Sequence, residues 1–193
     1  MSLKKINFKC FDPTRTSFSN VEMKVRVLGI DPGSRVTGYG IVELDGSDVS
    51  YVKHGALDLI GKTTNFSDRL ALLGQNLRLI LSEFAPQHVA IEKVFLGRNA
   101  DSAFKLGHAR GVAVYESAIQ GCQLHEYATR EVKKGITGSG AAEKNEVMAV
   151  LYRLLRISTR QEKSFDASDA LALAYFHCHK LQMQNLIRRS VQI

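Results

Sequence analysis

The spacing of apolar residues along the chain predicts three strands first, and then helices and strands in alternation. Residues 25–30 form a short buried strand that ends on Asp31, because five of these six residues are apolar or glycine. A second strand over 37–44 and a third over 49–57 flank a turn that contains Asp45-Gly46. These three segments predict an antiparallel meander.

Helical spacing begins after the meander. Apolar residues recur every three or four positions over 66–84, following the N-cap candidate Asn65 and stopping before Pro86. Residues 88–92 then read as a short buried strand, and this strand also ends on a carboxylate, Glu92.

A second helix is predicted over 102–120, with Asp101 as a possible cap and Gly121 at its end, and a fifth strand over 122–127. A stripe of small residues along this helix allows another backbone to approach closely. We expect the stripe to pack on the sheet, and a twin helix in a dimer is the less favoured alternative. Its members are Ala103, Gly107, Gly111, Val114 and Ala118.

The chain becomes more basic after Thr129. A glycine-rich loop is predicted over 135–140, a helix over 142–155 and a last helix over 166–181, and the tail 182–193 has no clear pattern. The element order implies an α/β fold, a mixed sheet with helices on its faces. Basic residues surround the loop: Arg130, Lys133, Lys134 and Lys144.

Length, charge and cysteine content limit the classes to which this protein can belong. The 193 residues suffice for one domain, and the net charge of +7 with a pI near 9.4 fits a polyanionic partner such as nucleic acid. The three cysteines are scattered, which argues against disulfides and for a reducing, cytoplasmic setting. The sequence holds no apolar run of about 18 residues, so no membrane span is expected. Residues 1–22 are polar and are expected to be a disordered extension, with Met23 as a candidate functional start.

Four carboxylates stand at the ends of predicted elements. Asp31 and Glu92 end two strands, and Asp166 with Asp169 share one face of a helix's first turn. If these elements are neighbours, the four groups repel each other unless a divalent metal such as Mg²⁺ or Mn²⁺ binds them. Each has a simpler alternative: Asp31 starts a turn, Glu92 pairs with Lys93, and the other two cap the helix.

Four segments make a more specific resemblance, to the RuvC-type Holliday-junction resolvases. It covers about residues 23–180, in order, and leaves 1–22 outside. The family's four acidic positions fall on Asp31, Glu92, Asp166 and Asp169. The segments are LGIDPGSRVTGYG at 28–40, IEKVF at 91–95, NADSA at 99–103 with KLG at 105–107, and DASDALA at 166–172.

The resemblance implies a ribonuclease-H-like fold with a mixed five-stranded sheet over 23–181, in which three antiparallel strands precede parallel ones. It also implies a homodimer that makes paired nicks in strands of like polarity at four-way DNA junctions, during recombination and repair. Two Mg²⁺ ions per active site are expected, with Mn²⁺ as a substitute, together with a branch-migration motor of the RuvA and RuvB type.

The same resemblance implies a set of DNA-binding residues. Phe95 is expected near the scissile strand, in a segment with Arg98 and Asn99, and Lys133 and Lys144 match basic positions that contact DNA. From the residues alone, core packing for the aromatic ring and a solvated charged face for the lysines are the simpler interpretations.

Other interpretations of the sequence remain. A junction-binding protein without cleavage has no use for gathered negative charge, and an ATPase related to the sugar kinases needs two such domains around ATP. The triplet His177-Cys178-His179 does not favour structural zinc, because residues two apart on a helix point in different directions. Cys122 with His125 offers no clear second half-site.

Overall fold

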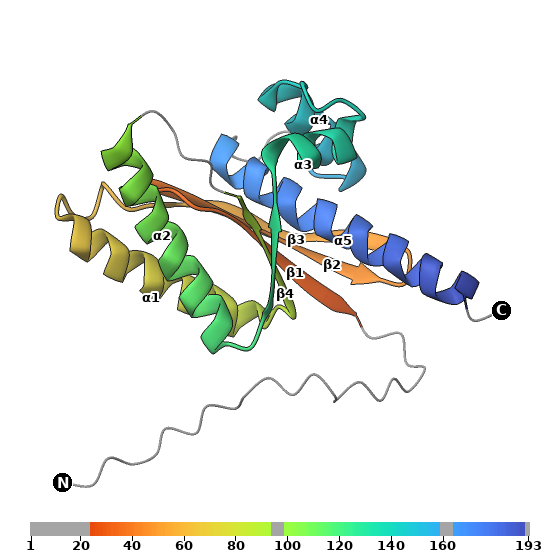
Figure 1. Ribbon diagram of the computed structural model, residues 1–193, viewed down its shortest axis with the longest axis horizontal. Coiled ribbons are helices and arrows are strands. Elements are labelled where there is room, and N and C mark those ends of the chain that lie inside the picture. Colours follow the sequence, from red (N-terminus) through yellow and green to blue (C-terminus); the bar gives the residue numbers. More distant parts are fainter. Residues whose placement is uncertain (1–23, 94–98, 159–163, 192–193) are drawn as a thin grey trace, which may run out of the picture.

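The strands assemble into one five-stranded sheet of order β3-β2-β1-β4-β5 (Figure 1). The computed structural model describes residues 24–93, 99–158 and 164–191. The first three strands pair antiparallel, whereas β4 is parallel to β1 and β5 is parallel to β4. The predicted mixed sheet is therefore confirmed. The strands are β1 Val25–Asp31, β2 Val36–Asp45, β3 Asp48–Asp58, β4 His88–Glu92 and β5 Gln123–Tyr127.

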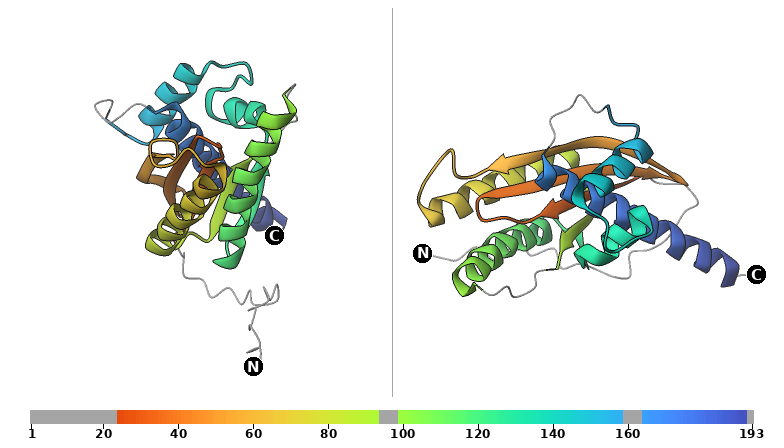
Figure 2. Two further views of the ribbon diagram at one scale, coloured as in Figure 1. Left: turned by 90° about the vertical axis from the view of Figure 1, so that its left-hand side faces the viewer. Right: turned by 90° about the horizontal axis from the view of Figure 1, so that it is seen from above.

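Helices cover both faces of the sheet (Figures 1 and 2). One face packs against α1 and α2, and α5 crosses the other face with α3 and α4 beside it. Successive side chains of β1 point to opposite faces of the sheet, so they belong to two different hydrophobic cores. Val27 lies in the core on the α5 side and Leu28 in the core on the α1 side. The helices are α1 Phe66–Phe84, α2 Ala100–Ile119, α3 Thr129–Thr137, α4 Lys144–Leu154 and α5 Phe165–Val191.

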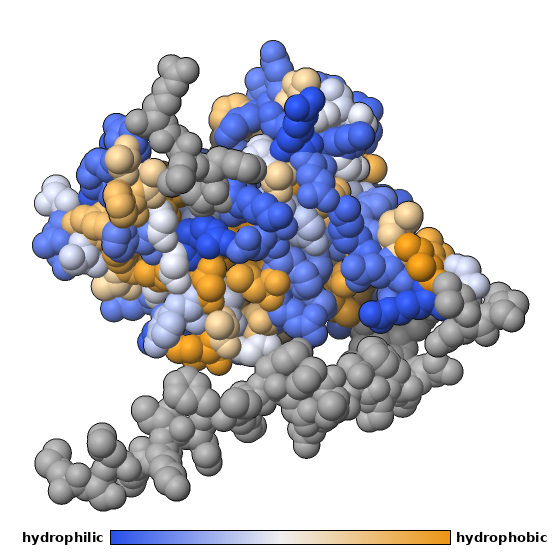
Figure 3. Space-filling model, viewed as in Figure 1, coloured by the Kyte–Doolittle hydropathy of each residue, from blue (hydrophilic) through white to orange (hydrophobic). Residues whose placement is uncertain are grey.

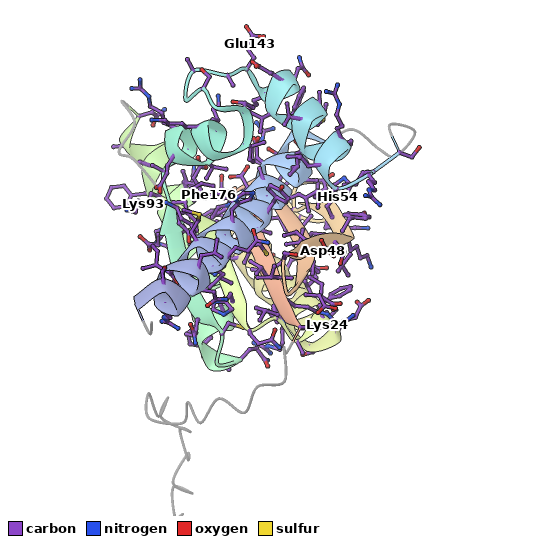
Figure 4. All side chains as sticks on the ribbon, turned by 90° about the vertical axis from the view of Figure 1, so that its right-hand side faces the viewer. Lys24, Asp48, His54, Lys93, Glu143 and Phe176 are labelled. Carbon is purple, nitrogen blue, oxygen red and sulfur yellow. The ribbon has the colours of Figure 1, made fainter. Side chains whose placement is uncertain are left out.

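Side-chain contacts fasten the α5 face together (Figure 4). Phe176 of α5 meets Tyr127 of β5 edge to face, with ring centroids 5.0 Å apart. His54 of β3 hydrogen-bonds through Nε2 to the Tyr152 hydroxyl of α4, at 2.9 Å. None of the helices in the described part of the chain is long and apolar enough to span a membrane.

Helix α1 starts and ends as the sequence predicts. The Asn65 side chain accepts a hydrogen bond from the Ser67 amide at 2.8 Å, and Ala85 before Pro86 closes the helix at φ 43°. Helix α2 starts earlier than predicted, because Asn99 rather than Asp101 caps it.

The prediction of a glycine-rich loop over 135–140 was partly wrong. Helix α3 continues through Gly135 to Thr137 and ends at Gly138, whose φ is 82°. A Cβ at Gly135 would lie 2.2 Å from the Phe176 ring, so this glycine serves helix packing and not a turn. Helix α4 begins at Lys144, two residues after the predicted start at 142.

The predicted end of the last helix at residue 181 was also wrong, because α5 continues to Val191. No glycine or proline interrupts the helix after Phe165. Its last turns expose Leu186 and Ile187 to solvent, so no buried stripe marks them in the sequence.

The two glycines of the small-residue stripe on α2 do not pack on the sheet, contrary to the favoured expectation, whereas Val114 does pack against the core on that side. A Cβ at Gly107 or Gly111 would meet nothing within 4 Å. The face of α2 turned toward the protein carries Ala109, Ala113, Glu116 and Ser117 instead.

Three glycines, Gly29 of β1 with Gly38 and Gly40 of β2, let α5 lie directly on the strands. A Cβ at Gly29 of β1 would stand 1.9 Å from the carbonyl oxygen of Ala170, and one at Gly38 of β2 would stand 1.9 Å from that of Asp166. Because any larger residue would push the helix away, these positions fix the height of α5 above the sheet.

Gly29→Ala should therefore lower the free energy of unfolding by about 3 kcal/mol, as overpacking against rigid backbone does. Gly55→Ala is the matched control, because its Cβ would meet the Tyr39 ring, a side chain that can move. We expect the control to lose about 1 kcal/mol in urea unfolding. Equal losses in the two variants would contradict close backbone contact at Gly29.

Candidate active site

Asp31 and Glu92 lie side by side because β1 and β4 run parallel. Ile30 pairs with Ile91, so the next residue of each strand is a carboxylate. Gly29 and Ala90 face α5, and Asp31 and Glu92 follow two residues later on the same face. The sheet thus presents both carboxylates to the start of α5.

The start of α5 adds Asp166 and Asp169 to this pair. Asp31 pairs with Gly38 across the β1–β2 ladder, and Gly38 touches the backbone of Asp166. Ser164 occupies the capping position, since its hydroxyl accepts a hydrogen bond from the Ala167 amide at 3.4 Å. The alternative in which Asp166 caps the helix is therefore not what the structure describes.

The pKa of Asp31 reflects how close the four carboxylates are to one another. The pKa of Asp31 is raised from 3.8 to about 8. Burial is the largest cause, and the charges of Glu92, Asp169 and Asp166 and a hydrogen bond with Glu92 act in the same direction. Without a cation, this carboxyl holds its proton at neutral pH. The structure thus brings together all four carboxylates that the sequence singled out.

Two neighbours partly compensate this negative charge. Lys144 at the start of α4 forms an ion pair with Asp169, with Nζ and Oδ2 2.5 Å apart, and this hydrogen bond raises the pKa of Lys144. The Thr129 hydroxyl at the start of α3 donates to the Glu92 carboxylate. Thr129 was not among the residues predicted from the sequence. The signal for it was its place directly after β5, the strand beside β4.

Three of the five predicted DNA-binding residues lie in the part of the chain that the structure describes. Lys133 donates from Nζ to the Ala142 carbonyl oxygen at 2.7 Å and so braces the connection between α3 and α4. Asn99 is exposed and caps α2. Phe95 and Arg98 lie outside the described residues, as do residues 1–22.

A hollow of about 590 Å³ opens between β3 and the start of α5, beside the carboxylates. Tyr51, His54 and Asp58 of β3 line it on one side, with Ser164 and Asp166 on the other. Its polar lining was not predicted, because the β3 residues acquire this role only when α5 lies across the sheet.

The donor set fits a hard divalent cation. Carboxylate oxygens are the ligands that Mg²⁺ and Mn²⁺ prefer, and a cation would relieve the repulsion that leaves Asp31 protonated. Asp31, Glu92, Asp166 and Asp169 are the residues that would hold it.

Fold and site together define a divalent-metal-dependent nuclease of the ribonuclease-H-like class. The family model described as crossover junction endodeoxyribonuclease RuvC matches residues 27–177. The chain therefore belongs to the RuvC family of crossover junction endodeoxyribonucleases, and the resemblance in the sequence is confirmed.

Individual relatives agree with the family assignment. The chain is 44% identical to RuvC of Bdellovibrio bacteriovorus over 171 residues, which is 89% of this chain and all of that protein. It is 43% identical to RuvC of Serratia proteamaculans over 164 residues, 85% of this chain and 91% of that one.

Solved structures show the same fold. Thermus thermophilus RuvC in complex with a Holliday junction substrate matches with a TM-score of 0.75 and 26% identity, over 83% of this chain and 96% of that one. The yeast mitochondrial Holliday junction resolvase Ydc2 matches with a TM-score of 0.65 at 14% identity, over 87% of this chain and 84% of that one. At that identity the likeness concerns the fold alone.

We predict that Asp31→Asn stabilises the metal-free protein, by about 1–3 kcal/mol at pH 7. Between about pH 4 and pH 8 the folded chain keeps a proton on Asp31 that the unfolded chain has lost, so wild-type stability falls as pH rises through this range. Asparagine removes this pH dependence. Urea unfolding in a chelating buffer across this range measures both effects, and a variant less stable than wild type at pH 7 would contradict the repulsion.

Proposed function

We propose that this chain resolves four-way DNA junctions by paired, symmetric nicks in strands of like polarity, with two Mg²⁺ ions in each active site. The observation that carries the proposal is the set of carboxylates around Asp31, whose pKa is raised to about 8. Such a set is unfavourable without cations and suits hydrolysis of a phosphodiester with them.

In the proposed reaction, water attacks the scissile phosphorus in line with the 3′ oxygen. The new bond joins the water oxygen to phosphorus, and the bond from phosphorus to the 3′ oxygen breaks. The water loses a proton to a base and the 3′ oxygen gains one, which leaves 5′-phosphate and 3′-hydroxyl ends. Bound Mg²⁺ would lower the pKa of this water and stabilise the leaving oxygen.

The residues take separate roles in this reaction. Asp31 and Glu92 would share the two metals, since they end neighbouring parallel strands. Asp169 would hold one metal, and Asp166 would hold metal or accept the proton of the attacking water. Thr129 orients Glu92 through its hydrogen bond, so the carboxylate keeps one direction as the metals bind.

Lys144 is the best supported of the DNA contacts that we propose. It is exposed and stands 2.5 Å from Asp169, so a phosphate that approaches the carboxylates meets a cation first. Lys133, Asn99, Phe95 and Arg98 remain proposed contacts on family grounds. The charge of +7 supports a nucleic-acid partner, and free Cys122 and Cys178 fit action in the reducing cytoplasm.

We further propose a homodimer formed through the outer face of α2. Phe104, Tyr115 and Ile119 are 70%, 59% and 54% exposed and follow one face of the helix, opposite the buried face. Gly107 and Gly111 lie between them and leave room for a second backbone. Figure 3 shows apolar patches on the side of the molecule that α1 and α2 cover.

A dimer suits the substrate. A four-way junction has two-fold symmetry, and paired cuts need two active sites related by a two-fold axis. A branch-migration motor of the RuvA and RuvB type would supply the moving junction, as the family implies.

Two rival functions are less favoured. A non-cleaving junction-binding protein gains nothing from carboxylates that destabilise the fold and repel DNA. An ATP-binding relative of the sugar kinases needs a second domain to enclose the nucleotide, and the described residues form one sheet.

The test of cleavage is a mobile four-way junction and a linear duplex of matched sequence, each with Mg²⁺. Wild type should nick the junction far faster than the duplex. Asp31→Asn should cut it more than about a hundredfold slower, while binding it as tightly or more tightly, because a negative charge is removed. Asp48→Asn, on an exposed hairpin residue, is the charge-matched control and should cut like wild type (Figure 4).

Each rival predicts a different result. Equal cutting by Asp31→Asn and wild type would remove the proposed mechanism. Binding without cutting by wild type would favour the non-cleaving rival, and ATP binding at micromolar affinity would favour the kinase-like one.

The dimer is tested by Tyr115→Glu, which places a charge on the outer face of α2. Sedimentation should give twice the chain mass of 21.4 kDa for wild type and the single chain mass for the variant. Leu186→Glu, equally exposed near the end of α5, is the control and should stay dimeric. A dimeric Tyr115→Glu protein would place the interface elsewhere.

A further inference from the structure

Three histidines meet beneath the middle of α5, away from the carboxylates at the start of that helix. His88 begins β4, His125 lies in β5, and His177 faces them from α5. Ring centroids stand 4.0 Å apart for His125 and His177, 5.0 Å for His88 and His177, and 5.2 Å for His88 and His125. One ring nitrogen of each lies within 4.8 Å of the other two.

One nitrogen in this cluster lacks a partner that its burial demands. His177 is only 2% exposed, and its Nδ1 is 2.6 Å from the Tyr127 hydroxyl. Its Nε2 is buried with no hydrogen-bond partner among the described residues. A buried polar atom left unpaired is costly, so a ligand at this nitrogen would be favoured.

We propose that His88, His125 and His177 bind one transition-metal cation, of which Zn²⁺ is the physiological candidate. Imidazole nitrogen suits Zn²⁺, whereas Mg²⁺ prefers oxygen. This site is separate from the carboxylates and independent of the proposed function.

The geometry needs little change to accept the ion. Tetrahedral bonds of about 2.0–2.1 Å to nitrogen place two ligand atoms roughly 3.4 Å apart. His88 Nδ1 and His125 Nε2 are 3.0 Å apart, so they would separate by only a few tenths of an ångström. Three histidines leave the fourth position to water.

Tyr127 would act in the outer shell of this site. With Nε2 of His177 on the metal, Nδ1 carries the proton and donates to the Tyr127 oxygen. The same hydrogen bond then fixes the tautomer and the ring direction, and the orphaned atom becomes a metal ligand.

The protonation state already matches a ligand set. The pKa of His88 is lowered to about 4 and that of His177 to about 3, mainly by burial and in part by the neighbouring histidines, and burial also lowers the pKa of His125. The three imidazoles are therefore neutral at pH 7, so a cation displaces no proton from charged rings.

The histidine site connects β4, β5 and α5, and both β4 and α5 also carry carboxylates of the active site. His88 stands four residues before Glu92 on the same face of β4, about 13 Å away along the strand. The edge strand β5 pairs only with β4 in the sheet that the structure describes. A cation held by β4, β5 and α5 would tie this edge strand to the rest of the fold.

The experiment uses untagged full-length protein in millimolar Mg²⁺, titrated with Co²⁺ and then with Zn²⁺. Wild type should develop the intense visible absorption of tetrahedral Co²⁺ with one ion per chain, lose it when Zn²⁺ displaces the ion, and melt several degrees higher with Zn²⁺. His125→Gln, on a half-buried residue, should weaken binding more than about tenfold. His88→Gln should do the same.

Two control variants test whether the three histidines, and not other residues, bind the metal. His179→Gln changes an exposed histidine two residues from His177 on α5 and should bind Zn²⁺ like wild type. Asp31→Asn should also bind it normally, because the carboxylates are not involved. Absence of the Co²⁺ spectrum in wild type, or binding lost in Asp31→Asn and kept in His125→Gln, would overturn the proposal.

Discussion

The contact between α5 and the bare backbone of β1 and β2 is the constraint on which the rest of the molecule depends. Gly29 and Gly38 carry no side chain, so the helix backbone rests on the strands. A helix carried higher by a layer of side chains would hold Asp166 and Asp169 too far from Asp31 to act on the same ion. The same contact brings His177 down to β4 and β5.

The two cores flanking the sheet hold a site that is unfavourable in itself. Ile30 and Ile91 immediately precede Asp31 and Glu92 and are fully buried on the α1 side. Burial of each such side chain stabilises the fold by about 1.5–3 kcal/mol. The carboxylates therefore stay close together despite their mutual repulsion. A bound cation relieves this repulsion, which strengthens cation binding.

Much of the fold and the site could be predicted because it follows from local sequence patterns. The strand ending at Glu92 and the cap at Asn65 follow from short-range periodicity and side-chain chemistry. The end of α5 could not, since its exposed turns lack a buried stripe. The α2 stripe was misplaced because small residues indicate close approach without naming the partner. The carboxylates were predicted through element ends, whereas the hydrogen bond from Lys133 to the connection between α3 and α4 had no signal in the sequence.

The histidine cluster marks the limit of sequence-based inference. Its members come from β4, β5 and α5, so no spacing in the sequence connects them, and the neighbouring pair His177 and His179 suggested a geometry that a helix cannot supply. Two sets of ligands now lie under one helix. Oxygen donors surround Asp31 and nitrogen donors surround His177, so ligand chemistry alone is enough to direct a hard cation to the start of α5 and a softer one to its middle.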